Sequence, residues 1–70
     1  MKYELSQTGN VMIQLYDVSG RWIHTIKDQK QTQGNHQIEI RLADLPEGVY
    51  FIQLQTPQGQ QTLKLIRTNP

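Results

Sequence analysis

The chain has 70 residues, no cysteine, and a net charge of +1 from seven basic and six acidic side chains. This length fits one small domain, whose core has to form without disulfide bonds. The balanced charge argues against nucleic-acid binding, and no apolar segment approaches the roughly 20 residues that cross a bilayer. No apolar region follows Met1 and Lys2, so no signal peptide is expected. The protein therefore stays where it is made or is a piece of a larger exported chain.

Short stretches of alternating apolar and polar residues predict six strands, near residues 2–6, 10–17, 21–28, 36–42, 48–56 and 60–67. The 21–28 stretch has apolar residues on both faces, so its phase stays open. Residues 28–35 are polar and predict a solvated, mobile loop. Short strands separated by glycine-containing turns are typical of an all-β fold, here a small antiparallel sandwich or an open barrel.

Three four-residue units share one turn pattern: 17–20, 45–48 and 56–59 each end in glycine, and proline is second in the latter two. Proline fixes φ near −65° for the first central position of a turn, and glycine tolerates the positive φ at its end. A type I turn followed by a glycine is a common hairpin connection. The residues expected to define these turns are Asp17, Gly20, Pro46, Gly48, Pro57 and Gly59.

The sequence offers few side chains for catalysis or metal binding. Ser6 and Ser19 are the only serines, and neither lies in the strand–turn–helix motif that exposes a nucleophile. The six acidic residues are scattered among turns and solvent-facing strand positions rather than paired. His24 and His36 are the only histidines, and no cysteine is present to complete a metal site. We therefore predict a protein that is not an enzyme and that binds no metal or cofactor.

The large aromatic residues allow two interpretations. They pack in the core, as a domain this small requires, or they form a platform on which sugars stack. Phe51 is the unusual member, because it lies on the glutamine-bearing face of the 48–56 strand and would be a second packing contact or a partner site. The set consists of Tyr3, Tyr16, Trp22, Tyr50 and Phe51.

Three stretches in a fixed order resemble a known family. They are GNVMIQLYDVSGR at 9–21, preceded by Tyr3 and Leu5, then LPEGVYFIQL at 45–54 and TLKLIR at 62–67. Their order and spacing resemble the C-terminal sorting domains of the type IX (Por) secretion system of Bacteroidetes. The resemblance covers roughly residues 3–67. It implies an immunoglobulin-like sandwich of about six or seven strands, with 1–70 as a single sorting domain of a larger exported protein.

The same resemblance implies a function and partners. Such a domain directs its parent through the periplasm and across the outer membrane, to the cell surface or the medium. The translocon and an outer-membrane shuttle protein read it, and a surface sortase commonly removes it and attaches the cargo to lipopolysaccharide. By position, Gly20 and Gly48 would hold turns. The recognised signal would include Lys64, Leu65, Ile66 and Arg67, with Phe51 as a further candidate contact.

Two departures from the family pattern suggest how the isolated chain behaves. No asparagine-proline segment and no additional strand precede Tyr3, and the chain continues through 68–70. A missing strand would leave an exposed sheet edge, so we expect edge-to-edge pairing into a homodimer. Two alternative functions remain open: an immunoglobulin-like structural or adhesive module, similar to a domain of flagellar hook-capping proteins, and a glycan-binding accessory module of an extracellular enzyme.

Overall fold

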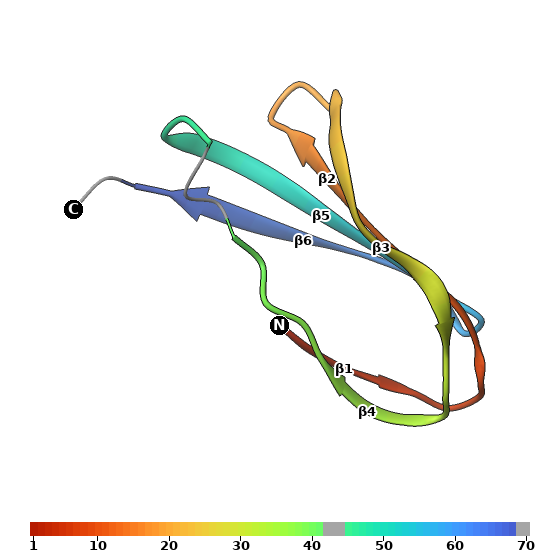
Figure 1. The fold of residues 1–70 in the computed structure, drawn as a ribbon. Coiled ribbons are helices and arrows are strands. Elements are labelled where there is room, and N and C mark those ends of the chain that lie inside the picture. The colour runs from red at the N-terminus through yellow and green to blue at the C-terminus, as the bar shows by residue number, and fades with distance from the viewer. Residues whose placement is uncertain (42–44, 69–70) are drawn as a thin grey trace.

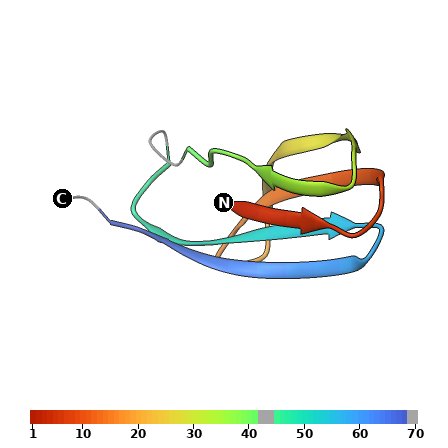
Figure 2. The same cartoon turned by 90° about the horizontal axis from the view of Figure 1, so that it is seen from below.

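The computed structural model describes residues 1–41 and 45–68, which form six strands in two antiparallel sheets. The larger sheet has the order β3-β2-β5-β6, and β1 pairs with β4 in a two-stranded ribbon (Figure 1). The ribbon lies across one face of the larger sheet, so the molecule is a small β-sandwich (Figure 2). This confirms the all-β prediction. The strands are β1 (Lys2–Leu5), β2 (Gly9–Asp17), β3 (Trp22–Gln31), β4 (Gly34–Gln37), β5 (Gly48–Thr56) and β6 (Gly59–Arg67).

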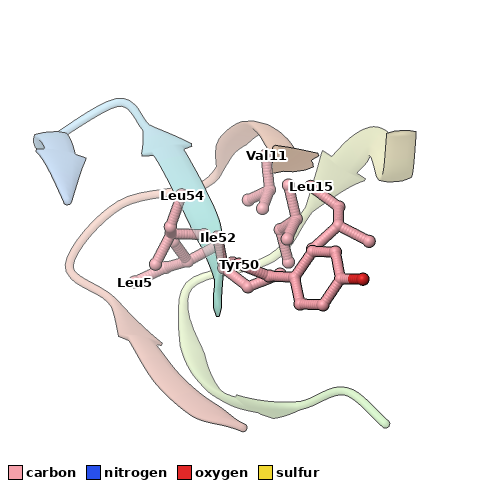
Figure 3. Close-up of a cluster of buried hydrophobic side chains, with 7 residues drawn as sticks. Leu5, Val11, Leu15, Tyr50, Ile52 and Leu54 are labelled. Atoms are coloured by element: carbon pink, nitrogen blue, oxygen red, sulfur yellow. The ribbon is translucent and has the colours of Figure 1, made fainter. Parts of the chain in front are cut away.

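The core lies between the larger sheet and the ribbon. Alternation places every second side chain of the two central strands, β2 and β5, on this inner face, where Leu15 is paired with Ile52 and Ile13 with Leu54. Leu5 of β1 closes the cluster from the opposite layer (Figure 3). Burying such a side chain contributes roughly 1.5–3 kcal/mol. The buried set is Leu5, Val11, Ile13, Leu15, Tyr50, Ile52 and Leu54.

The prediction of a mobile loop at 28–35 is wrong. β3 continues to Gln31 and β4 begins at Gly34, so only Thr32 and Gln33 separate them. The polar residues 28–31 pair with residues 9–12 of β2, whose backbone ladder holds them regardless of side-chain polarity. Because β3 is an edge strand of the sheet, its side chains do not need to be apolar.

The predicted strand at 36–42 is also shorter than expected. β4 ends at Gln37, and no strand is assigned at 38–41, while Leu42 lies outside the described residues. Ile38 still exchanges two backbone hydrogen bonds with Met1, both 2.9 Å long. Ile38 and Ile40 are half-buried against the core, so the alternation identified their inward side although the strand itself is not continued.

The sequence left undecided which side chains of the 21–28 stretch point toward the core, and the structure shows the reason. The pairing of β2 with β3 shifts register twice, between Ile13 and Gln14 and again between Leu15 and Tyr16. Such bulges change which side chains point inward. As a result Ile23 and Ile26, three residues apart, both pack against the core.

None of the described residues forms a helix of the length and apolarity that a bilayer crossing requires.

Candidate recognition surface

The turn after β2 is organised by one carboxylate. Oδ1 of Asp17 accepts hydrogen bonds from the backbone N–H of Ser19 (2.9 Å), the hydroxyl of Ser19 (2.7 Å) and the backbone N–H of Arg21 (2.9 Å). These hydrogen bonds lower the pKa of Asp17. The bond from the Ser19 hydroxyl is the largest cause, and the bond from the Arg21 backbone N–H is the second largest. Gly20 closes the turn with φ +87° and donates to the Asp17 carbonyl at 3.0 Å. Asp17 and Gly20 therefore both form hydrogen bonds within this turn.

The turn before β5 is held from two directions. The hydroxyl of Tyr50, whose ring lies in the core, donates to the carbonyl of Pro46 at 2.6 Å. From the end of β6, Nε of Arg67 donates to the carbonyl of Leu45 at 3.1 Å. A tyrosine bonded to the backbone a few residues upstream is a feature of immunoglobulin-type sandwiches. Arg67 thus contacts the protein's own turn, which gives it a structural contact in addition to its predicted role in recognition.

The β5–β6 hairpin contacts the β1–β2 turn. Thr56 and Gly59 pair across the hairpin, with Pro57 and Gln58 between them. The side-chain carbonyl of Gln58 accepts the backbone N–H of Ser6 at 2.7 Å. Gly9 packs directly against the Pro57 ring, leaving no space for a methyl group at that position.

The last strand presents its predicted recognition residues on two faces. In the ladder with β5, Ile66 pairs with Val49 and Lys64 with Phe51, all on the outer face of the sheet. Lys64 is exposed and Ile66 is 65% exposed. Leu65 lies on the inner face beside Tyr50 and is half-buried. The structure therefore brings Phe51, Lys64 and Ile66 together and separates Leu65 from them.

Phe51 belongs to a row of aromatic residues across the outer face. Tyr16 of β2 pairs with Phe51 on one side and with Trp22 of β3 on the other. We call Trp22, Tyr16 and Phe51 the aromatic row. Trp22 is 54% exposed, and Lys64 continues the row on β6. Phe51 is thus one element of a surface that crosses the whole sheet.

Trp22 is the member of this surface that sequence reasoning did not place. The available clue was symmetry about the 17–20 turn, because residues that flank a hairpin turn pair with each other. The bulges in β3 hid the alternation that would otherwise have set the phase of Trp22.

The two remaining aromatic residues lie elsewhere. Tyr50 is in the core. Tyr3 stacks on His36 with ring centroids 5.5 Å apart and donates its hydroxyl to Gln31. Burial raises the pKa of Tyr3 above its ordinary value. The five aromatic residues therefore do not form one platform: three share the outer face and two do not.

Groups that could support catalysis or metal binding are dispersed. Among residues 1–41 and 45–68, no three histidine or acidic side chains lie close enough together to hold a metal ion. His24 is exposed, and Nε2 of His36 lies 2.6 Å from the carbonyl of Thr32. Glu39 forms an exposed ion pair with Arg41 at 3.2 Å, a kind of contact that contributes little to stability.

A family model described as a secretion-system C-terminal sorting domain matches residues 2–68. The matched region contains all six strands, the three glycine-ended turns and the outer face of β5 and β6. No curated protein and no solved structure matches the chain.

Proposed function

Because the chain belongs to the family of secretion-system C-terminal sorting domains, we propose that it is the export label of a larger protein. The label acts in type IX secretion and ends the cargo polypeptide. It passes through the periplasm with its cargo and directs it across the outer membrane to the cell surface or the medium. The observation that carries this proposal is the family match over residues 2–68. The family is one of sorting signals rather than of catalysts, so we propose no catalytic role.

The outer face formed by the start of β5 and the end of β6 is the proposed contact for the secretion machinery. Phe51, Lys64 and Ile66 adjoin one another there, and two of them expose apolar or charged groups to solvent. An exposed apolar side chain beside a cation provides both desolvation energy and orientation for a partner. Leu65 and Arg67 support this surface from behind, through the core and the Leu45 carbonyl. The proposed partners are the translocon, an outer-membrane shuttle protein and a surface sortase.

A secreted reporter tests the proposal. The 70 residues are fused behind a periplasmic reporter with a signal peptide in a Bacteroidetes host, and reporter activity is measured in the periplasm, on the cell surface and in the medium. We expect the complete fusion to leave the periplasm and the fusion lacking 64–70 to stay there. If the complete fusion also stays in the periplasm, the sorting function is wrong for this chain.

A matched pair of variants on β6 locates the contact. The double variant Lys64→Ala/Ile66→Ala alters the proposed surface. The control is the double variant Gln60→Ala/Thr62→Ala, which alters the same face of β6 further from the end of the strand. All four positions are exposed, so both variants are expected to fold, which circular dichroism checks. We expect the first variant to accumulate in the periplasm and the second to be exported normally. Equal export of both would remove Lys64 and Ile66 from the recognised surface.

The aromatic row supports a second candidate function, binding of an extracellular glycan. Three rings on adjacent strands extend about 10 Å across the sheet, given an interstrand spacing of about 4.8 Å. The next row on this face carries Gln14 and Gln53, neutral amides suited to sugar hydroxyls. Titration with soluble polysaccharides, followed by Trp22 fluorescence, tests this function, and Phe51→Ala should weaken any response. An unchanged spectrum across the polysaccharides would exclude it.

A further inference from the structure

The two edges of the larger sheet differ in how they are protected. The β3 edge contains two register shifts and the charged residues Lys27, Asp28 and Lys30, features that discourage strand pairing. β6 pairs with β5 in one unbroken register over nine residues, from Gly59 to Arg67. It contains no proline, and of its two charged residues Arg67 is bonded to the Leu45 carbonyl. Among the described strands, β6 is therefore the long, regular edge open to another strand (Figure 1).

An apolar hollow lies beside this edge. It has a volume of about 370 Å³ and is lined by Met1, Ile40, Ile52, Leu63 and Leu65. Leu63 is 41% exposed although its neighbours on the inner face of the sheet are core residues. A strand added to β6 would satisfy the free backbone groups of the edge and cover part of this apolar surface at the same time.

We propose that this strand is β6 of a second copy, antiparallel, with the twofold axis at Leu63. Leu63 is the midpoint of Gly59–Arg67, so this register pairs all nine residues with their symmetry equivalents. Lys64 then lies opposite a threonine and Arg67 opposite a glycine, since each position pairs with its mirror position about residue 63. The polar first half of each strand faces the apolar and basic second half of the other.

Neighbouring registers are less favourable. Moving the axis to Lys64 places two lysines directly opposite each other, which is destabilising in a cross-strand pair, and shortens the paired region to residues 61–67. Moving the axis to Thr62 also shortens the pairing and leaves Ile66 and Arg67 outside it. Full pairing over nine residues and the avoidance of a lysine pair thus favour the register centred on Leu63, and the dimer would have a continuous eight-stranded sheet.

Sedimentation velocity between about 1 and 100 μM tests the dimer, since small interfaces below about 1,200 Å² associate weakly. Leu63→Lys places two like charges on the axis, whereas His24→Lys adds the same charge to an exposed position at the β3 edge. We expect the native chain and His24→Lys to dimerise as concentration rises and Leu63→Lys to remain monomeric, with all three giving the same circular dichroism spectrum. A native chain that is monomeric throughout overturns the proposal, as does dimerisation of Leu63→Lys equal to that of the native chain.

Cross-linking tests the register. The chain has no cysteine, so each single-cysteine variant reports on one position. In the proposed dimer the two residues at position 63 are directly opposite, with Cα atoms about 4.5–5.5 Å apart, a separation that a disulfide spans. Under mild oxidation Leu63→Cys should cross-link much faster than Lys64→Cys or His24→Cys. Faster cross-linking of Lys64→Cys contradicts the register, and faster cross-linking of His24→Cys assigns the interface to β3 instead. Neither sedimentation nor cross-linking depends on export, so the dimer can be disproved while the proposed function stands.

Discussion

One carboxylate oxygen of Asp17 accepts three hydrogen bonds from the turn that follows it, two of them from Ser19. These bonds favour the ionised form, so the pKa of Asp17 is lower in the folded chain than its ordinary value. A lowered pKa contributes stability that is present above the unfolded-state pKa and is lost as the pH falls through the folded-state pKa.

We expect Ser19→Ala to raise the pKa of Asp17 toward its ordinary value, because it removes the hydroxyl that is the largest cause of the shift. NMR titration of the Asp17 carboxyl measures this directly. Asp17→Asn serves as the control, since it should remove this carboxyl's contribution to the loss of stability at acidic pH. A carboxyl pKa that is the same with and without the Ser19 hydroxyl would contradict the assignment.

At Gly9 the backbone of β2 lies directly against Pro57 in the β5–β6 turn. A methyl group at this position overlaps the Pro57 ring, so Gly9→Ala should destabilise the fold by about 1–3 kcal/mol, the cost of overpacking. Urea unfolding measures the change. Repeating Gly9→Ala in a Pro57→Ala background restores the space, and the cost should fall markedly. An equal cost in both backgrounds would show that the Pro57 contact is not responsible.

At the scale of elements, regular alternation predicted the bounds of the two central strands well. It did not predict segments whose position depends on backbone pairing rather than on side-chain burial. β2 and β5 lie within one residue of their predicted bounds because each has one buried face. β3 runs to Gln31 through polar residues because its ladder with β2, rather than side-chain burial, holds it there. Beyond Gln37 the side chains at 38 and 40 point inward without a paired strand.

The recognition surface was predictable in part for the same reason. Phe51 stood out on a glutamine-bearing strand, and position in the family pattern indicated Lys64 and Ile66. Trp22 was not added, because the bulges in β3 break the alternation along that strand, and only its symmetry with Tyr16 about the 17–20 turn indicated its face. Register between strands is a property of the assembled sheet and leaves little trace in either strand alone.

Tyr50 connects strand β5 to the turn at 45–48 that precedes it. Tyr50→Phe keeps the ring in the core and removes the hydrogen bond to the Pro46 carbonyl, which should cost about 1 kcal/mol. Tyr16→Phe is the matched control, because its hydroxyl makes a longer bond of 3.3 Å to Gln53 on the outer face and should cost less. The free energies of unfolding of both variants, measured by urea titration, show whether the Tyr50 hydroxyl holds the turn. Equal costs would mean that the turn is held by contacts other than the Tyr50 hydroxyl.

At the scale of the whole molecule, stability depends on a few side chains. Seven residues form the buried cluster of the described chain, and the single core of a domain this small rarely supplies more than about 3–5 kcal/mol of stability. Ile52 has no exposed surface, and Ile52→Ala should cost about 2–5 kcal/mol. We therefore expect this variant to be largely unfolded at 25 °C, which circular dichroism and urea titration measure, whereas Val18→Ala in the exposed turn should behave as native.

The same pair of variants distinguishes a folded signal from a linear one. Ile52→Ala leaves the sequence from Lys64 to Arg67 intact but removes the sheet that places Phe51 beside Lys64. If the secretion machinery reads the folded outer face, a reporter carrying Ile52→Ala stays in the periplasm while the Val18→Ala reporter is exported. Export of both with equal efficiency would show that the terminal sequence alone is sufficient. In that case the sandwich would protect the strand, and the surface formed by Phe51, Lys64 and Ile66 would not be what the machinery recognises.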